Sequence, residues 1–381
     1  MKPAAPPSPK LVPPFADRIE GLSEDTCDTL SDVALGASIF GTLNWYGHLA
    51  STSMLNGSVA SYLVVDAGGP TCVPLIQRKA DGMQRIEALS NFYSPQFEPV
   101  AHTSQIPALA STFARYAVTT SPAVDLVELR PLDTDSAFFA AAQAALRKAG
   151  FWVDSFFCFG NWYLELSGQR FDDYFLERPS QLRNTWRRNR KKLEQRGLRI
   201  DILRENSPAL EAAIIDYESI YNSSWKHPEP FSEFIPGLVR MAAKQGWLRM
   251  GVLQLEGKAV AAQIWFVKDG VASIYKLAYI EEFAKQSVGT VLTHELMRSA
   301  IDEDRVHVVD YLSGDDAYKR DWMTHRRERR GIIAFNQRRP RAILAAARHF
   351  GGRWLKTVRG LSEPAAAMPL ADLNPRSPVK T

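Results

Sequence analysis

Hydrophobic and polar residues alternate in three consecutive stretches of the first third of the chain, which is the pattern of β-strands. The stretches are 62–66, 71–77 and 83–90, and turns at 68–70 and 81–82 separate them. The periodicity changes to that of a helix over 106–117, after an earlier helical stretch at 44–52. A strand at 124–129, a helix at 136–149 and two short strands at 151–157 and 162–166 follow.

The second half of the chain repeats this order. A strand at 198–203 and helices at 209–223 and 236–245 lead to a strand meander at 248–255, 259–267 and 271–278; a helix at 289–303, a strand at 306–312 and a last strand at 331–337 come next. Two copies of one α+β domain with a mixed sheet are the simplest account. We place them at residues 16–170 and 171–337.

The two ends of the chain differ in composition from the rest. Residues 1–15 and 362–381 are rich in proline and small residues, and we expect both to be disordered. Residues 338–361 predict a basic amphipathic helix with one apolar stripe: Ile343, Ala347, Phe350, Trp354 and Val358. Such a helix can dock on its own domain or lie on an anionic membrane, and the pair Gly351-Gly352 favours docking.

Overall composition is that of a globular protein. Hydrophobic residues make up 45% and charged residues 23% of the 381 residues, and the net charge is +4. The three cysteines show no pairing pattern, and no stretch has the length and apolar character of a membrane span or signal peptide. We therefore expect a cytoplasmic protein.

Several familiar chemistries lack their motifs. No glycine-rich nucleotide loop follows a strand, and no G-x-S-x-G marks a serine nucleophile. The seven histidines have no metal-ligand spacing. We expect no metal, no nucleotide hydrolysis and no DNA partner.

A strongly basic segment joins the two copies. Residues 180–199, SQLRNTWRRNRKKLEQRGLR, carry eight basic residues against one glutamate. Leu182, Trp186 and Leu193 fall on one face of the helix that this segment predicts. Arg183 and Arg187, one turn apart, form a candidate phosphate clamp; a solvated face is the alternative.

Two further segments combine residue types that suit acyl transfer. The loop 284–292, AKQSVGTVL, ends in a glycine at a predicted helix start, where unpaired N–H groups and the helix dipole favour an anion; an ordinary helix cap is the alternative.

The segment 312–322, LSGDDAYKRDW, is the second. It places Tyr318 and Trp322 on one face, with Lys319 beside it. A tyrosine can protonate a leaving thiolate and a lysine can neutralise an oxyanion, whereas Asp315 as N-cap, a pair of Asp316 with Arg320 and a buried aromatic pair are the structural alternative.

These residues resemble a known family. Residues 263–266, the run YKLAYIEEFAKQSVGTVLTHELMRSAIDED and the run VHVVDYLSGDDAYKRDW look like the acetyltransferase domain of the GNAT superfamily. More narrowly they resemble the CelD-like branch that occurs in cellulose and exopolysaccharide operons, which is similar to Fem-type peptidoglycan transferases. The resemblance is specific over 180–331 and rests on element order over 35–165.

The resemblance implies an N-acyltransferase made of two tandem GNAT-like domains, the first of them degenerate. It would move an acyl group from acetyl-CoA or another acyl-CoA to an amine on a sugar, a peptide or an envelope precursor. The donor-binding residues it implies are Gln286, Ser287, Val288, Gly289 and Thr290. The catalytic candidates are Tyr318, Lys319, Asp315 and Asp316, and the substrate-binding candidates are Arg183, Trp186, Arg187 and Trp322.

Two alternatives remain open at this point. A Fem-type enzyme would use aminoacyl-tRNA as donor, with residues 180–199 as the RNA contact. A degenerate transferase would bind a polyanion as an accessory protein without catalysis. For either enzyme, residues 338–361 are the candidate for peripheral contact with the inner membrane face.

Overall fold

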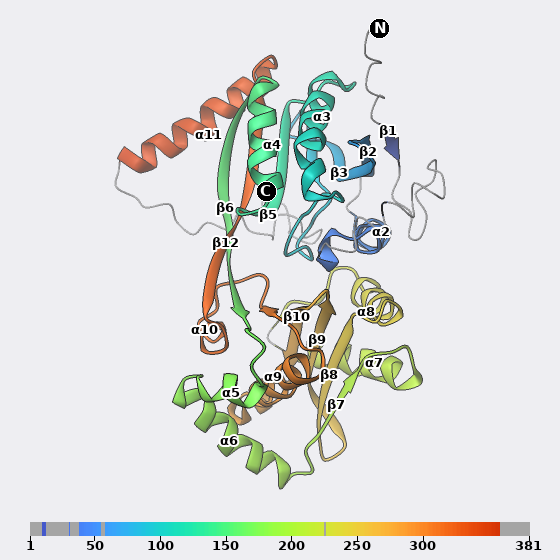
Figure 1. Cartoon of the computed structure of the whole chain (residues 1–381), viewed down its shortest axis with the longest axis vertical. Helices are drawn as coiled ribbons and strands as arrows, with labels where there is room; N and C mark the ends of the chain where they lie inside the picture. Colours follow the sequence, from blue (N-terminus) through green and yellow to red (C-terminus); the bar gives the residue numbers. More distant parts are fainter. Residues whose placement is uncertain (1–9, 13–29, 31–37, 55–57, 225, 359–381) are drawn as a thin grey trace, which may run out of the picture. The chain divides into compact units, whose positions relative to one another are not determined.

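The computed structural model describes residues 10–12, 30, 38–54, 58–224 and 226–358. Two compact units divide the chain, whose elements are drawn in Figure 1. The first unit comprises Met1–Phe159 and Glu328–Thr381, and the second unit comprises Gly160–Arg327.

The first unit is a sheet with helices. Its strands are β1 (Lys10–Val12), β2 (Val59–Asp66), β3 (Pro70–Ala80), β4 (Met83–Ala88), β5 (Leu126–Asp133), the first part of β6 (Phe151–Glu165) and most of β12 (His325–Asn336), in the order β1-β2-β3-β4-β5-β12-β6. Its helices are η2 (Ile39–Gly41), α2 (Leu43–Thr52), η3 (Thr103–Gln105), α3 (Ile106–Thr119), α4 (Ala137–Lys148) and α11 (Pro340–Val358). The Ser136 hydroxyl accepts from the Phe139 N–H at 3.2 Å, which fixes the start of α4.

The second unit contains the strands β7 (Arg199–Leu203), β8 (Leu248–Leu255), β9 (Lys258–Lys268), β10 (Val271–Tyr279) and β11 (Val308–Asp310), with the end of β6 beyond β11. Its helices are α5 (Phe171–Leu176), α6 (Ser180–Glu194), α7 (Pro208–Asn222), α8 (Phe234–Lys244), η4 (Glu281–Gln286), α9 (Val288–Arg298), the π-helix η5 (Ser299–Glu303) and α10 (Lys319–Trp322). Every residue of β9 from Val260 to Phe266 is buried, because α9 and α7 both pack against this strand.

The predicted repeat is present in both units. In the first unit the antiparallel strands β2, β3 and β4 lead through α3 to β5, which pairs with β4 in parallel. In the second unit β8, β9 and β10 lead through α9 to β11, which pairs with β10 in parallel. The α+β class with a mixed sheet is therefore confirmed.

The boundaries of the two units differ from the predicted division after residue 170. The predicted strands at 151–157 and 162–166 are one strand, β6, and its last residues pair with β11 of the second unit. Strand β12 begins in the second unit at His325 and continues into the first unit, where it pairs with β5 through Arg329–Phe335. Because each of these strands crosses a unit boundary, a single cut in the sequence cannot separate the units.

Two terminal predictions also change. Residues 10–12 lie within the segment predicted to be disordered, yet they form β1 against β2; the other residues of 1–15 and the tail 362–381 lie outside the described residues. In α11, Ala342 and Ala346 pack with Leu126 and Phe335. The predicted docking of this helix on its own domain is thus confirmed, but the face that packs on the sheet consists of alanines. Their small side chains allow the helix to approach the sheet closely. Ile343, predicted to be in the docked stripe, is exposed.

Candidate active site

The strands β10 and β11 separate next to the start of α9. They pair only from Val271 to Ser273 with Val308 to Asp310, and β10 then continues without β11 as far as Tyr279. Strand ends that diverge beside a helix N-terminus leave an opening, and ligands commonly bind in such openings. The second unit has a cavity in this region.

This cavity has a volume of about 390 Å³. It is bounded by α6, the strands β9 and β10, the first turns of α9 and the segment that follows β11. The lining residues are Gln181, Leu182, Thr185, Gln263, Leu277, Tyr279, Gly289, Thr290, Thr293, Tyr311, Tyr318, Asp321 and Trp322. Hydroxyl, amide and aromatic groups dominate, and Asp321 is the one carboxylate among the described residues of the lining.

A buried amide holds the start of α9 against the sheet. The Gln263 Nε2 group donates to the carbonyl of Gly289 at 3.1 Å and to the hydroxyl of Thr293 at 2.8 Å. The indole N–H of Trp265 donates to the Gln263 carbonyl oxygen at 2.8 Å. With all its bonds made, this amide fixes the cavity wall formed by Gly289 and Thr293.

The donor loop predicted at 286–290 forms this N-terminus, and its five residues play different parts. Gly289 and Thr290 line the cavity, whereas Val288 is buried in the hydrophobic core. Ser287 has φ +54° and accepts a hydrogen bond from Asn189 of α6 at 2.9 Å. Gln286 accepts one from Arg196 at 2.9 Å. The side chains of Gln286 and Ser287 are therefore bonded to the segment 180–196, which includes α6.

Tyr318 brings a phenol to the cavity. Its side chain is 45% exposed and its ring meets the ring of Tyr311 edge-to-face, with centroids 5.8 Å apart. Partial burial raises the pKa of the Tyr318 phenol, and the nearby groups of Asp316 and Tyr279 raise it further. The phenol is protonated at neutral pH, as that of an ordinary tyrosine is.

Lys319 does not line the cavity. Its ammonium group donates to the carbonyls of Ser313 at 2.5 Å and Gly314 at 3.2 Å, and it pairs with Asp316 at 3.1 Å. The side chain is buried, and burial lowers the pKa of Lys319. Lys319 therefore holds the loop that precedes Tyr318. It is absent from the cavity lining, where its predicted contact with substrate would be made.

The two candidate carboxylates also lie outside the lining. Asp315 accepts from Arg326 at 2.7 Å and from the Trp162 indole at 2.6 Å, and these contacts lower the pKa of Asp315. It is not an N-cap, because α10 begins at Lys319 with Tyr318 in the cap position. Asp316 pairs with Lys319 and not with Arg320 as predicted.

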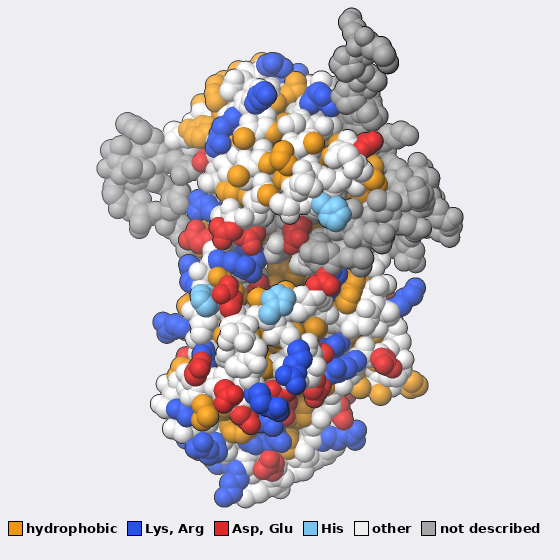
Figure 2. All heavy atoms as spheres, in the orientation of Figure 1, with side chains coloured by type: hydrophobic (Ala, Val, Ile, Leu, Met, Phe, Trp, Pro, Cys, Tyr) orange, Lys and Arg blue, Asp and Glu red, His pale blue; other side chains and the backbone are white. Residues whose placement is uncertain are grey.

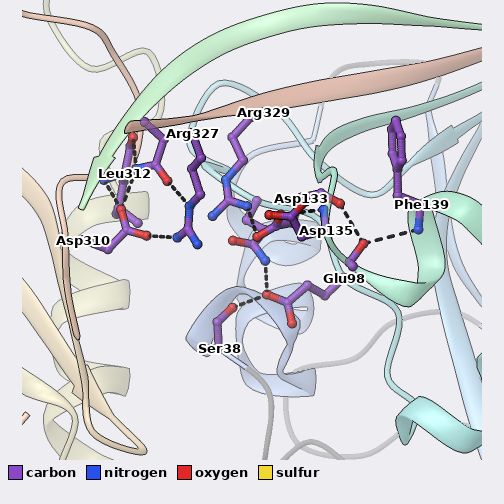
Figure 3. Close-up of polar contacts among 12 residues, drawn as sticks. Ser38, Glu98, Asp133, Asp135, Phe139, Asp310, Leu312, Arg327 and Arg329 are labelled. Atoms are coloured by element: carbon purple, nitrogen blue, oxygen red, sulfur yellow. Dashed lines mark hydrogen bonds and ion pairs between the residues drawn. The ribbon is translucent and has the colours of Figure 1, made fainter. Parts of the chain in front are cut away.

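A buried polar network holds the chain between β11 and Tyr318. Asp310, 4% exposed, accepts from the Leu312 N–H and from Asn161, both at 2.6 Å. It also pairs with Arg327 at 2.5 Å, and Figure 3 shows Arg327 and Leu312 on either side of this carboxylate. Leu312 has φ +55°, so the network holds a strained turn. This turn sets where the following segment, with Tyr318, begins.

The four substrate-binding candidates divide in the structure. Trp322 lines the cavity, as Tyr318 does, so the predicted shared face is confirmed. Trp186 lies outside the lining and stacks on His294. Arg183 donates to the carbonyl of Arg178 at 3.0 Å, and Arg187 is exposed. Neither Arg183 nor Arg187 lines the cavity, and the Arg183–Arg187 phosphate clamp stays a prediction.

Sequence reasoning missed several groups at the site. Gln263, Tyr279, Tyr311 and Asp321 line the cavity, and all but Asp321 come from strands or strand ends that read only as hydrophobic core. Lys226 donates to the carbonyl of the lining residue Leu277 at 2.5 Å. Burial and the neighbouring Lys276 lower the pKa of Lys226 to about 8.

A histidine is buried where α5, α6 and α9 meet. The His294 ring stacks on Trp186 with centroids 3.9 Å apart, and the rings of Phe171 and Phe175 approach it edge-on, each at 4.6 Å. Its Nδ1 lies 3.1 Å from Glu295. Burial lowers the pKa of His294, so the folded chain holds this ring neutral.

This burial predicts acid sensitivity. The unfolded chain binds a proton on this histidine at a pKa of about 6.5, which the folded chain binds only at lower pH, so stability is lost as the pH falls below that value. We expect His294→Phe to reduce the loss of melting temperature between pH 7.5 and 5.5. The exposed His227→Phe is the control, and an unchanged loss in His294→Phe would contradict the assignment.

Comparison with known proteins agrees with this geometry. Residues 180–320 match the model of the acetyltransferase (GNAT) domain. Over this segment the second unit is similar to a GNAT domain. The match lies within the segment over which the sequence was expected to resemble this superfamily, so that expectation is confirmed. No curated protein matches the chain.

Solved structures share the fold over both units. FemX superposes with a TM-score of 0.62 at 11% identity, covering 85% of this chain and 98% of its own. L-PGS from Bacillus licheniformis superposes with a TM-score of 0.53 at 14% identity, covering 84% and 95%. A conserved protein from Bacteroides thetaiotaomicron gives 0.54 at 11% identity, covering 85% and 99%. At these identities the likeness is one of fold.

The fold and the domain match together support an acyltransferase. Among the described residues, no helix is long and apolar enough to cross a membrane.

Proposed function

We propose that the chain is an N-acyltransferase that takes its acyl group from acyl-CoA. The observation that carries the proposal is the cavity of the second unit, which joins the N-terminus of α9 at Gly289 and Thr290 to the protonated phenol of Tyr318. The helix N-terminus suits the donor's pyrophosphate, and the phenol suits its leaving thiolate. The match of residues 180–320 to a GNAT domain supports the same donor class.

The reaction assigns a role to two lining residues. The neutral amine of the acceptor attacks the thioester carbonyl carbon, and as the C–N bond forms the C–S bond breaks. The sulfur takes the phenolic proton of Tyr318. The surplus proton of the amine passes to the carboxylate of Asp321, which lines the same cavity. Asp321 then releases its proton to solvent and the phenolate regains one, so both groups return to their starting states.

For the acceptor we propose an amine on a sugar, a peptide or an envelope precursor. This class comes from the resemblance of the segment 263–322 to the CelD-like branch, and the shared fold of FemX and L-PGS is consistent with it. Asp321 and Tyr279 in the lining offer hydrogen-bond partners to an amine and to its neighbouring hydroxyls.

Turnover of the donor tests the proposal. The full chain is incubated with acetyl-CoA and longer acyl-CoAs beside a panel of amino sugars and peptides, and released thiol is followed. We expect acceptor-dependent thiol release. A donor at 100 times its Kd should also stabilise the fold by about 2.7 kcal/mol. Stabilisation and turnover with aminoacyl-tRNA but not with acyl-CoA would show that aminoacyl-tRNA is the donor. No stabilisation and no turnover with either donor would favour a non-catalytic accessory protein.

A further inference from the structure

One flank of α6 carries a row of polar residues that begins in the cavity. Gln181, Thr185, Arg188 and Lys192 are spaced by four, three and four residues, so they follow one another along the same side of the helix. Gln181 and Thr185 line the cavity. Arg188 and Lys192 therefore continue the cavity-lining row over the next turns of α6.

The same end of α6 reaches the start of α9. Asn189, next to Arg188, donates to the Ser287 hydroxyl at 2.9 Å, and Arg196, four residues beyond Lys192, donates to Gln286 at 2.9 Å. A donor with its acyl group near Tyr318 and its pyrophosphate at this N-terminus thus extends toward Arg188 and Lys192.

Among the residues that the structure describes, no opposite charge pairs with Arg188 or Lys192. Both side chains are exposed. Their neighbours differ: Arg190 pairs with Glu194 and Glu295, and Arg196 pairs with Glu256. Two like charges four residues apart disfavour a helix unless an anion lies between them.

We propose that Arg188 and Lys192 bind the 3′-phosphate on the ribose of a CoA donor. The inference rests on the proposed function and adds the group that distinguishes CoA from its dephosphorylated analogue. After the pyrophosphate, this is the remaining anionic group of CoA. An exposed arginine and lysine suit a phosphate that stays in contact with water, where arginine can bind two oxygens at once. Basic side chains recur over the surface where α6 lies (Figure 2).

The test compares acetyl-CoA with 3′-dephospho-acetyl-CoA in three forms of the full chain. In the unaltered chain we expect removal of the 3′-phosphate to raise KM for the donor by about tenfold with kcat nearly unchanged. The double variant Arg188→Gln/Lys192→Gln should raise KM for acetyl-CoA by a similar factor and then use both donors equally well.

The control is the double variant Lys191→Gln/Lys244→Gln. It removes the same charge from exposed positions of α6 and α8 that lie outside this row, so it should retain the preference for the 3′-phosphate. The inference would be overturned if both donors were turned over and Arg188→Gln/Lys192→Gln kept the preference for acetyl-CoA. It would also be overturned if the control variant lost that preference equally. Either result would leave the proposed function intact. No turnover of either donor by the unaltered chain would overturn both.

Discussion

Tyr318→Phe is expected to lower kcat for acyl transfer by about 100-fold, within the range typical of general acid catalysis. The KM for acyl-CoA should change little, because the phenylalanine ring keeps its edge-to-face contact with Tyr311. The loss arises because the thiolate must leave without the proton that the phenol supplies. Steady-state kinetics of thiol release at saturating acceptor measure this effect.

The control for Tyr318→Phe is Tyr163→Phe, which removes a phenol of the second unit that lies outside the cavity lining. Its turnover should equal that of the unaltered chain, and both variants should keep their melting temperature. If Tyr318→Phe raised KM without lowering kcat, its hydroxyl would bind substrate and would not donate the proton.

Asp310→Ala is expected to lower the free energy of unfolding by roughly 3–5 kcal/mol, the cost of breaking a buried ion pair on one side. The substitution leaves the Arg327 guanidinium, the Asn161 amide and the Leu312 N–H without the carboxylate that now accepts from all three. Since the same network holds the turn at Leu312, acyl transfer should fall as well. Urea unfolding of the full chain measures the stability change.

Asp315→Ala gives the matched comparison. Asp315 also pairs with an arginine near the start of β12, Arg326 at 2.7 Å, but both side chains of this pair are substantially exposed. Exposed pairs contribute about 0–1 kcal/mol, so this variant should unfold nearly as the unaltered chain does. If both variants lost the same free energy of unfolding, burial of Asp310 would not explain its contribution to stability. Full activity of Asp315→Ala would also exclude Asp315 as a catalytic residue.

Local patterns predicted most helices and strands, because alternation and helical periodicity directly reflect burial. The helix at 180–194 shows this: Leu182 and Leu193 are buried and Trp186 packs on the same core, as their spacing predicted. The repeated order of strands and helices then predicted two copies of one fold.

Strand pairing far apart in sequence could not be predicted in the same way. The run HRRERR at 325–330 looks like a solvated loop, yet it starts β12, and Arg329 is buried in an ion pair with Asp133. Figure 3 shows Arg329 and Asp133 near the half-buried Glu98, which accepts a hydrogen bond from Ser38. Burial of an arginine can be predicted only when its ion-pair partner is known. The partner of Arg329, Asp133, lies almost two hundred residues earlier in the chain, so the local sequence does not reveal it.

Some of the predicted site residues line one cavity and others do not. Gly289, Thr290, Tyr318 and Trp322 do meet at one cavity, because they flank the place where β10 and β11 part. The charge of Lys319 suggests a contact with substrate, but in the structure its ammonium group donates to two carbonyls of the preceding loop. Tyr318 and Lys319 are adjacent in the sequence, yet only Tyr318 lines the cavity. The helix α10 that follows has four residues, and sequence periodicity cannot predict which side chains of so short a helix face a cavity.

Titration of acetyl-CoA into the full chain and into a variant with a filled cavity tests the central claim most directly. Thr290→Trp places a large ring at the lining of the first turn of α9, and Lys285→Trp adds the same ring at an exposed position of the preceding helix η4, outside the lining. The account predicts that the unaltered chain and Lys285→Trp bind one acetyl-CoA with similar affinity and that Thr290→Trp binds none. Equal binding by all three forms would contradict it, because the donor would then occupy another part of the protein.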